Sequence, residues 1–158
     1  GRICYQKNPS LFNAIAKKMP NTKFLWIGDG ELRNELQSDN IEITGWVNRE
    51  EALKRSLNAD VFVLTSLWEG LPLSLLEAMY MKKICVVSDV IGNRDVIRDG
   101  KNGYICRNVA DYIRAIEERR EECAEHAYQD IIDDFNVKGQ AEKYAQIYRK
   151  NGIRLDQR

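Results

Sequence analysis

A pair of glutamates offers the first chemistry in this sequence. Glu69 and Glu77 stand eight positions apart, on either side of a Gly-Leu-Pro turn, in the stretch WEGLPLSLLEAM. Pro72 suits the first position of a helix, whose free N–H groups and positive dipole end attract anions. Two carboxylates beside an anion site suit a ligand that carries both hydroxyl and phosphate groups. The spacing alone is weak evidence, because such pairs also arise by chance in a chain rich in glutamate.

Glu77 is unusual for its surroundings, since it is the one charged residue between Glu69 and Lys82. Apolar residues such as Leu76 and Met79 recur at helical spacing around it, so we expect a helix that is apolar on nearly every side. An unpaired carboxylate buried there would be costly. The pattern predicts either that Glu77 binds a ligand or that it is a stray residue near the surface.

A second set of candidate residues lies at the start of the chain. Gly1, Arg2 and Lys7 precede a helix that we expect to begin near Pro9. Glycine allows close backbone approach, and arginine forks onto phosphate oxygens. These residues predict either a loop that wraps an anion or an exposed basic N-terminus.

Composition narrows the class of protein. The 158 residues suit one domain that buries about two thirds of its unfolded surface. The net charge is 0, which gives no basic footprint for nucleic acid, and no apolar run approaches the length of a membrane span. The four scattered cysteines predict reduced thiols of a cytoplasmic protein, and His126 is expected to be a solvated helix residue.

Strands and helices are expected to alternate, and they must position these residues. Apolar runs predict strands at 23–27, 41–44 and 104–106. Two more strands are expected on either side of the Glu77 helix, one that begins at 61 and one that ends at 88, and both should be buried on both faces. Helices are expected at 9–19, 30–36, 49–57, between the two central strands, within 88–99, and over 109–150 with a break near Phe135. The last stretch carries an apolar stripe of Tyr144, Ile147 and Tyr148. This order predicts a Rossmann-like three-layer α/β/α sandwich with one parallel sheet of five or six strands, which binds ligands at the carboxyl ends of its strands.

Two glycine-containing turns leave alternatives open. Gly28-Asp29-Gly30 lacks the third glycine of a dinucleotide fingerprint, because Arg33 holds that place. It predicts either a plain turn into a helix with Asp29 as N-cap or a role beside the ligand. Trp46, after Gly45, is expected to pack rather than to stack on a base.

The stretch from Trp68 to Met79 closely resembles the signature of retaining glycosyltransferases of the GT-B architecture, of the group 1 or family 4 type. The likeness extends from Gly1-Arg2 to the region of Tyr148. It implies that residues 1–158 form a single domain, the C-terminal donor-binding half, and that an N-terminal acceptor-binding half belongs to a longer protein.

The sequence departs from this family in two places. Ile91-Gly92 and Asp95 stand where the family usually has a double glycine and a glutamate, which removes one point of backbone freedom. Lys82 takes the place of a helix-ending glycine, and a left-handed lysine would cost roughly 1 kcal/mol. We therefore expect the helix to end differently.

The resemblance also implies roles for individual residues. Glu69, Arg2 and Lys7 would form the catalytic set, in which the two cations stabilise the departing diphosphate and Glu69 holds hydroxyls of the transferred sugar. Glu77 would accept hydrogen bonds from the ribose, and the remaining donor-binding positions would be Gly70, Leu71, Leu73, Ser74 and Val47. The donor would be a UDP- or GDP-linked sugar, with no cofactor and no metal, since the chain has no Asp-x-Asp motif.

The reaction implied is retaining transfer of a hexosyl group to a sugar or lipid-linked acceptor in polysaccharide or glycoconjugate synthesis. The isolated domain is expected to be inactive. Two other readings stay open: a nucleotide-sugar epimerase of the same fold, and a non-catalytic interaction module. The expected location is the cytoplasm, with peripheral contact at the inner face of a membrane, through the full-length protein, as a further option.

Overall fold

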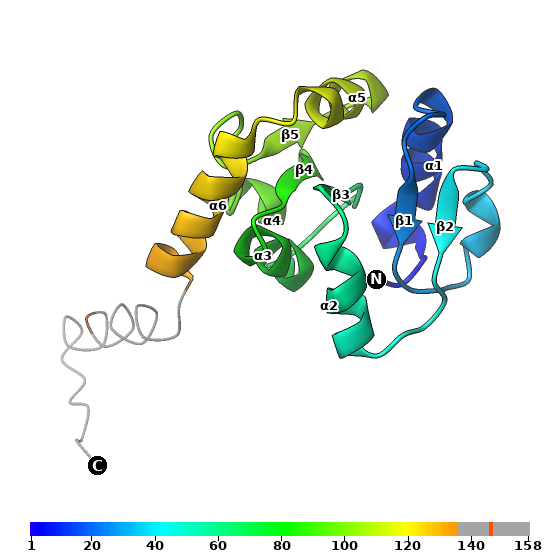
Figure 1. Cartoon of the computed structure of the whole chain (residues 1–158), viewed down its shortest axis with the longest axis horizontal. Coiled ribbons are helices and arrows are strands. Elements are labelled where there is room, and N and C mark those ends of the chain that lie inside the picture. Colours follow the sequence, from blue (N-terminus) through cyan, green and yellow to red (C-terminus); the bar gives the residue numbers. More distant parts are fainter. Residues whose placement is uncertain (136–145, 147–158) are drawn as a thin grey trace, which may run out of the picture.

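The computed structural model describes residues 1–135 and Gln146. Helices and strands alternate along them (Figure 1). In chain order they are the 3-10 turn η1 (Tyr5–Lys7), α1 (Pro9–Lys18), β1 (Phe24–Trp26), the 3-10 turn η2 (Arg33–Glu35), β2 (Ile41–Ile43), α2 (Arg49–Leu57), β3 (Val61–Leu64), α3 (Leu73–Tyr80), β4 (Ile84–Ser88), α4 (Ile91–Arg94), β5 (Tyr104–Cys106), α5 (Val109–Glu118) and α6 (Glu121–Asp134). The predicted α/β alternation is confirmed.

Three helices begin at an asparagine whose side chain caps the first turn. The Oδ1 atoms of Asn8, Asn48 and Asn108 accept hydrogen bonds from backbone N–H groups three residues later, at 3.3, 2.9 and 3.1 Å. Each cap satisfies a donor that the helix itself leaves free. These asparagines fix where α1, α2 and α5 start.

Strand β4 lies at the centre of three layers. Its residues alternate between two apolar clusters: Ile84 and Val86 face the cluster that includes α1 and α5, whereas Cys85 and Val87 face the cluster of α3 and α6. Every residue of β4 is buried, as expected for a parallel strand covered on both faces. The three-layer, Rossmann-like arrangement is therefore confirmed.

The strands are all parallel, as predicted, but they form two sheets instead of one. Strand β1 pairs with β2, and β3, β4 and β5 pair in that order, and Figure 1 shows the two groups apart. Helix α2 has no buried residue, and several of its small or short side chains line the space between β1 and β3. Strand β3 is therefore only partly buried, which corrects the expectation of burial on both faces.

Several local expectations also need correction. Residues 30–36 contain only the 3-10 turn η2, and Pro72 is the N-cap of α3 rather than its first residue. The long C-terminal helix is broken first at Arg119, whose φ of 39° separates α5 from α6. Helix α6 ends near the predicted break, whereas the stripe of Tyr144, Ile147 and Tyr148 lies outside the described residues.

The end of α3 has the geometry that the sequence argued against. Lys82 is left-handed, with a φ of 54°, and the N–H of Lys83 donates to the carbonyl of Ala78 at 2.9 Å. This 6→1 bond is the one that usually accompanies a glycine at this position. The expectation that the helix ends differently is wrong.

The expectations for the cysteines and for His126 are confirmed. All four cysteines are free thiols, and burial raises the pKa of Cys106 to about 12. His126 is an exposed residue of α6 whose Nδ1 lies 3.1 Å from the carbonyl oxygen of Lys101. Within the described part of the chain, no helix has the length and apolar character needed to cross a membrane.

Candidate donor-binding site

A cavity of about 750 Å³ lies between the two sheets. Beyond the carboxyl ends of β1 and β3 its lining includes Lys7, Thr65, Ser74, Glu77 and Arg49. Parallel sheets bind ligands at this end, where loops leave the strands and helices begin. Three predicted site residues, Lys7, Ser74 and Glu77, therefore line one hollow.

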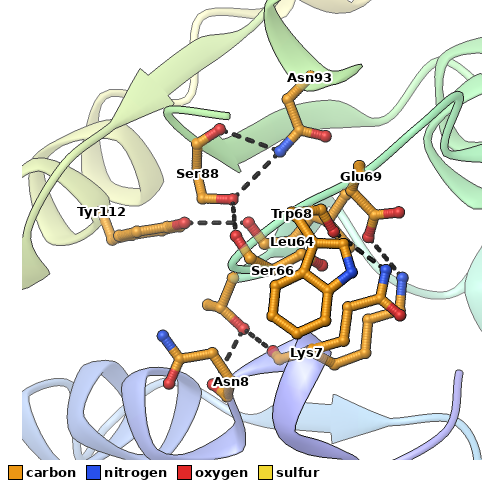
Figure 2. A network of polar contacts seen from close by, with 11 residues as sticks. Lys7, Asn8, Leu64, Ser66, Trp68, Glu69, Ser88, Asn93 and Tyr112 are labelled. Carbon is orange, nitrogen blue, oxygen red and sulfur yellow. Dashed lines mark hydrogen bonds and ion pairs between the residues drawn. The ribbon is translucent and has the colours of Figure 1, made fainter. Parts of the chain in front are cut away.

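Lys7 and Glu69 form an ion pair above β3. Lys7 Nζ lies 2.5 Å from Glu69 Oε1, and the side chains are 22% and 7% exposed. Figure 2 shows the end of the Lys7 side chain meeting the carboxylate of Glu69 beside Trp68. The structure thus brings together two members of the predicted catalytic set, which stand 62 positions apart in the sequence.

Hydrogen bonds to backbone carbonyls hold the two loops that carry this pair. The N–H of Leu67 donates to the carbonyl of Gln6 at 2.8 Å, and the side-chain amide of Gln6 donates to the carbonyl of Trp68 at 3.0 Å. Thr65 Oγ1 donates to the carbonyl of Lys7 at 2.7 Å. Lys7 and Glu69 are therefore positioned by the hydrogen bonds of neighbouring residues as well as by their own contact.

Arg2 lies apart from this pair and is exposed. Its Nε is 3.1 Å from Glu31 Oε2, and Arg2 does not belong to the cavity lining. Its backbone is nevertheless anchored on both sides, because Gly1 O accepts a bond from Trp26 Nε1 at 3.0 Å and the Ile3 N–H donates to Asp29 O at 2.8 Å. Arg2 would have to turn away from Glu31 to reach a ligand in the cavity.

The Gly28-Asp29-Gly30 turn explains this anchoring. A Cβ at Gly28 would stand 2.1 Å from the carbonyl oxygen of Gly1, and one at Gly30 would stand 2.2 Å from that of Ile3. Only glycine allows such contact. The turn therefore supports the segment that carries Arg2, and Asp29 caps no helix: its Oδ1 accepts the N–H of Gly30 at 2.9 Å.

Glu77 is partly exposed and paired, so the cost of a buried, unpaired carboxylate does not arise. It pairs with Arg49 at 2.5 Å, and the two side chains are 38% and 76% exposed, respectively. Sequence analysis missed Arg49, because it lies on α2, far from Glu77 in the sequence. The one feature of the sequence that indicated the position of Arg49 was Asn48. It starts α2, directly after the loop of residues 44–47 (the Val47 loop).

The start of α3 leaves backbone donors open. Among the described residues no side chain caps this helix at Pro72, so the N–H groups of Leu73 and Ser74 keep their capacity to bind an anion. Gly70, Leu71, Leu73 and Ser74 are exposed, and Val47 is partly buried. The expectation that Trp46 packs in the core is wrong, since it is 69% exposed.

Comparison with known proteins assigns this chain to a family. Residues 3–122 match the family described as "Glycosyl transferases group 1", and the chain belongs to this family. Its fold is that of GT-B glycosyltransferases. TarM of S. aureus, in a complex whose ligands include UDP, matches 94% of this chain and 34% of its own length at 24% identity, with a TM-score of 0.79.

A solved C-terminal domain has nearly the extent of the present chain. It is that of the glycosyl transferase group 1 protein LpcC from Francisella tularensis, with a TM-score of 0.73, 21% identity, and coverage of 87% of this chain and 84% of that one. The present chain therefore has the fold of that C-terminal domain.

Two curated relatives are longer than this chain. The UDP-Gal:alpha-D-GlcNAc-diphosphoundecaprenol alpha-1,3-galactosyltransferase of Escherichia coli is 30% identical, over 94% of this chain and 43% of its own length. The GalNAc-alpha-(1->4)-GalNAc-alpha-(1->3)-diNAcBac-PP-undecaprenol alpha-1,4-N-acetyl-D-galactosaminyltransferase of Campylobacter jejuni is 35% identical, over 66% of this chain and 32% of its own length. The chain thus spans less than half the length of either relative.

Proposed function

We propose that this chain is the donor-binding domain of a glycosyltransferase and that it binds a nucleoside-diphosphate sugar at the mouth of the cavity. The observation that carries the proposal is the Lys7–Glu69 pair beside the uncapped start of α3. One cation, open backbone donors and two carboxylates there match the diphosphate and the hydroxyl groups of such a donor.

The diphosphate would lie between Lys7 and the first turn of α3. Lys7 and the N–H groups of Leu73 and Ser74 would stabilise the charge that builds on the phosphate when the sugar departs. Arg2 would add a second cation, because its pair with Glu31 is exposed to solvent and is easily exchanged for a ligand phosphate. These positive groups would do the work of a metal ion.

The two carboxylates would divide the rest of the donor between them. Glu77, partly exposed at the cavity mouth, would accept hydrogen bonds from the ribose. Glu69 would keep Lys7 on Oε1 and accept sugar hydroxyls with its other oxygen. The backbone of Val47 would meet the base.

The proposed reaction transfers the sugar with retention of configuration. The bond between the anomeric carbon and the phosphate oxygen breaks, and its electron pair leaves with the nucleoside diphosphate. The acceptor hydroxyl attacks on the same face, and its proton passes to the departing phosphate oxygen or to a base outside this domain. The acceptor would be held by a second domain of a longer protein, and a lipid-linked saccharide agrees with the names of the two relatives.

A binding panel of UDP-, GDP- and ADP-sugars, read by ligand-detected NMR on this chain, tests the proposal. We expect saturable binding of one nucleotide class and competition by the matching nucleoside diphosphate. Failure to bind any of them would favour the interaction module. For the longer protein, a sugar product with one inverted stereocentre instead of a glycosylated acceptor would favour the epimerase.

A further inference from the structure

The turn that carries Glu69 is attached to a buried polar network (Figure 2). Ser88 Oγ donates to the carbonyl of Ser66 at 2.6 Å. Asn93 Nδ2 in turn donates to the carbonyl of Ser88 at 2.9 Å and to its Oγ at 3.1 Å. Since Asn93 and Ser66 are 0% and 1% exposed, these bonds are shielded from water. Helix α4 is thereby connected, through the end of β4, to the loop three residues before Glu69.

A backbone contact joins the same two segments. A Cβ at Gly92 would stand 1.9 Å from the carbonyl oxygen of Gly70 and 2.6 Å from that of Glu69. No side chain fits there, although Ile91 beside it is 70% exposed. The glycine that remains from the family's usual pair therefore supports the Glu69 turn directly.

The network contains two polar atoms that cost stability. Ser66 Oγ and Asn93 Oδ1 are buried and have no hydrogen-bond partner within the described residues. A buried polar group without a hydrogen-bond partner is unfavourable, and such a group in a native fold calls for an explanation. Asn93 thus holds the Ser88 end of the network at a cost, which points to a role other than stability.

We propose that Gly92 and Asn93 are positioning residues for Glu69. They hold the backbone of the Glu69–Gly70 turn in the position from which the Glu69 carboxylate can contact the transferred sugar. In this way they determine the affinity for the sugar part of the donor. This inference rests on the proposed function, because it concerns the sugar-binding role of Glu69.

The test compares the affinities of this chain for UDP-galactose and for UDP, measured by calorimetry well below the unfolding temperature. We expect Asn93→Ala and Gly92→Ala to weaken UDP-galactose binding about tenfold while UDP binding changes less than about twofold. Glu69→Ala should show the same pattern. In the Glu69→Ala background, Asn93→Ala should add no further loss, because both act on the same contact.

Two variants serve as matched controls. Asn102 is a second buried asparagine, 1% exposed, whose Nδ2 bonds the Val96 carbonyl and Asp130. Asn102→Ala should lower stability without changing the ratio of the two affinities. Ile91→Ala, next to Gly92 but exposed, should change neither.

Amide hydrogen exchange gives a readout that needs no ligand. Asn93→Ala should speed exchange in residues 66–70, and Asn102→Ala should not. Equal effects of the two asparagine variants, or equal losses for UDP and UDP-galactose, would overturn the positioning role. A wild-type chain that binds neither these probes nor any GDP- or ADP-sugar would contradict the proposed function as well, whereas a wild-type preference for UDP-galactose that Asn93→Ala leaves intact would overturn this inference alone.

Discussion

The Lys7–Glu69 ion pair is largely shielded from solvent, and this shielding determines what its loss would cost. Removing Lys7 would leave the carboxylate of Glu69, 7% exposed, without its partner. Lys7→Met should therefore lower the free energy of unfolding by roughly 3 kcal/mol, and the double variant with Glu69→Leu should recover most of that loss. Urea denaturation of the single and double variants measures both effects. A Lys7→Met protein as stable as the wild type would show that the pair is not buried in solution.

Glu77 differs from Glu69, because its pair with Arg49 is exposed. Glu77→Gln should leave the free energy of unfolding within about 1 kcal/mol of the wild type. The same change should weaken UDP binding by one to two decades, about 1.5–3 kcal/mol, since hydrogen bonds to the charged carboxylate are lost. Calorimetry measures the UDP affinity of the Glu77→Gln protein, with Glu50→Gln on α2 as the control variant. Unchanged affinity would remove Glu77 from the site.

For individual residues, the sequence predicted which side chains belong to the candidate site better than it predicted which residues they contact. The motif around Glu69 and Glu77 predicted a place near the carboxyl ends of the strands. The structure puts Glu69 in the loop after β3 and Glu77 on α3, in the lining of the cavity. Partners from distant segments were not predictable, because Arg49 meets Glu77 only through tertiary packing. The same holds for the exposure of Trp46.

Among the turns and helix ends, Gly30 tests whether the Gly-x-Gly turn positions Arg2. A methyl group at Gly30 would clash with the Ile3 backbone and displace the segment that carries Arg2. Gly30→Ala should therefore weaken UDP binding several-fold while binding of uridine, which has no phosphate, changes little. Gly1→Ala is the control, because a Cβ at Gly1 meets nothing. Equal weakening of both ligands would count against a phosphate role for Arg2.

The end of α3 allows backbone strain to be separated from side-chain contacts. Lys82 is left-handed, yet its ammonium lies 2.7 Å from Glu125 Oε2 and 4.6 Å from the centre of the Tyr128 ring. Lys82→Ala and Lys82→Gly both remove these contacts, but only glycine relieves the strain. Thermal unfolding should find the glycine variant more stable than the alanine variant by about 1 kcal/mol. The reverse order would show that residue 82 is not left-handed in solution.

Lys82 also shows why a local rule gave the wrong helix end. The cost of a left-handed lysine is comparable to the stabilisation by an ion pair plus a cation–π contact, which together are worth about 1 kcal/mol. Those contacts come from α6, more than 40 positions away. Tertiary contacts of this kind can outweigh a local preference and cannot be read from the stretch itself.

For the whole molecule, the order of strands and helices predicted the layers but not the division into two sheets. Alternating apolar runs are enough to predict parallel strands with helices on both faces. Whether β1 also pairs with β3 depends on how well α2 fills the space beside them. That helix buries no residue completely, and the donor is proposed to bind at the mouth of the cavity that remains beside it.

The central claim is that a nucleoside diphosphate binds where Lys7, the start of α3 and Glu77 meet. Titration of this chain with UDP and GDP, followed by amide chemical shifts, tests it most directly. We expect weak binding, with a Kd between about 1 μM and 1 mM, and shifts concentrated near Lys7, at residues 69–77 and in the Val47 loop. The bound chain should transfer no sugar alone, because a half-site cannot orient an acceptor. Saturable binding whose shifts map to another surface, or no binding of either nucleotide, would contradict the claim.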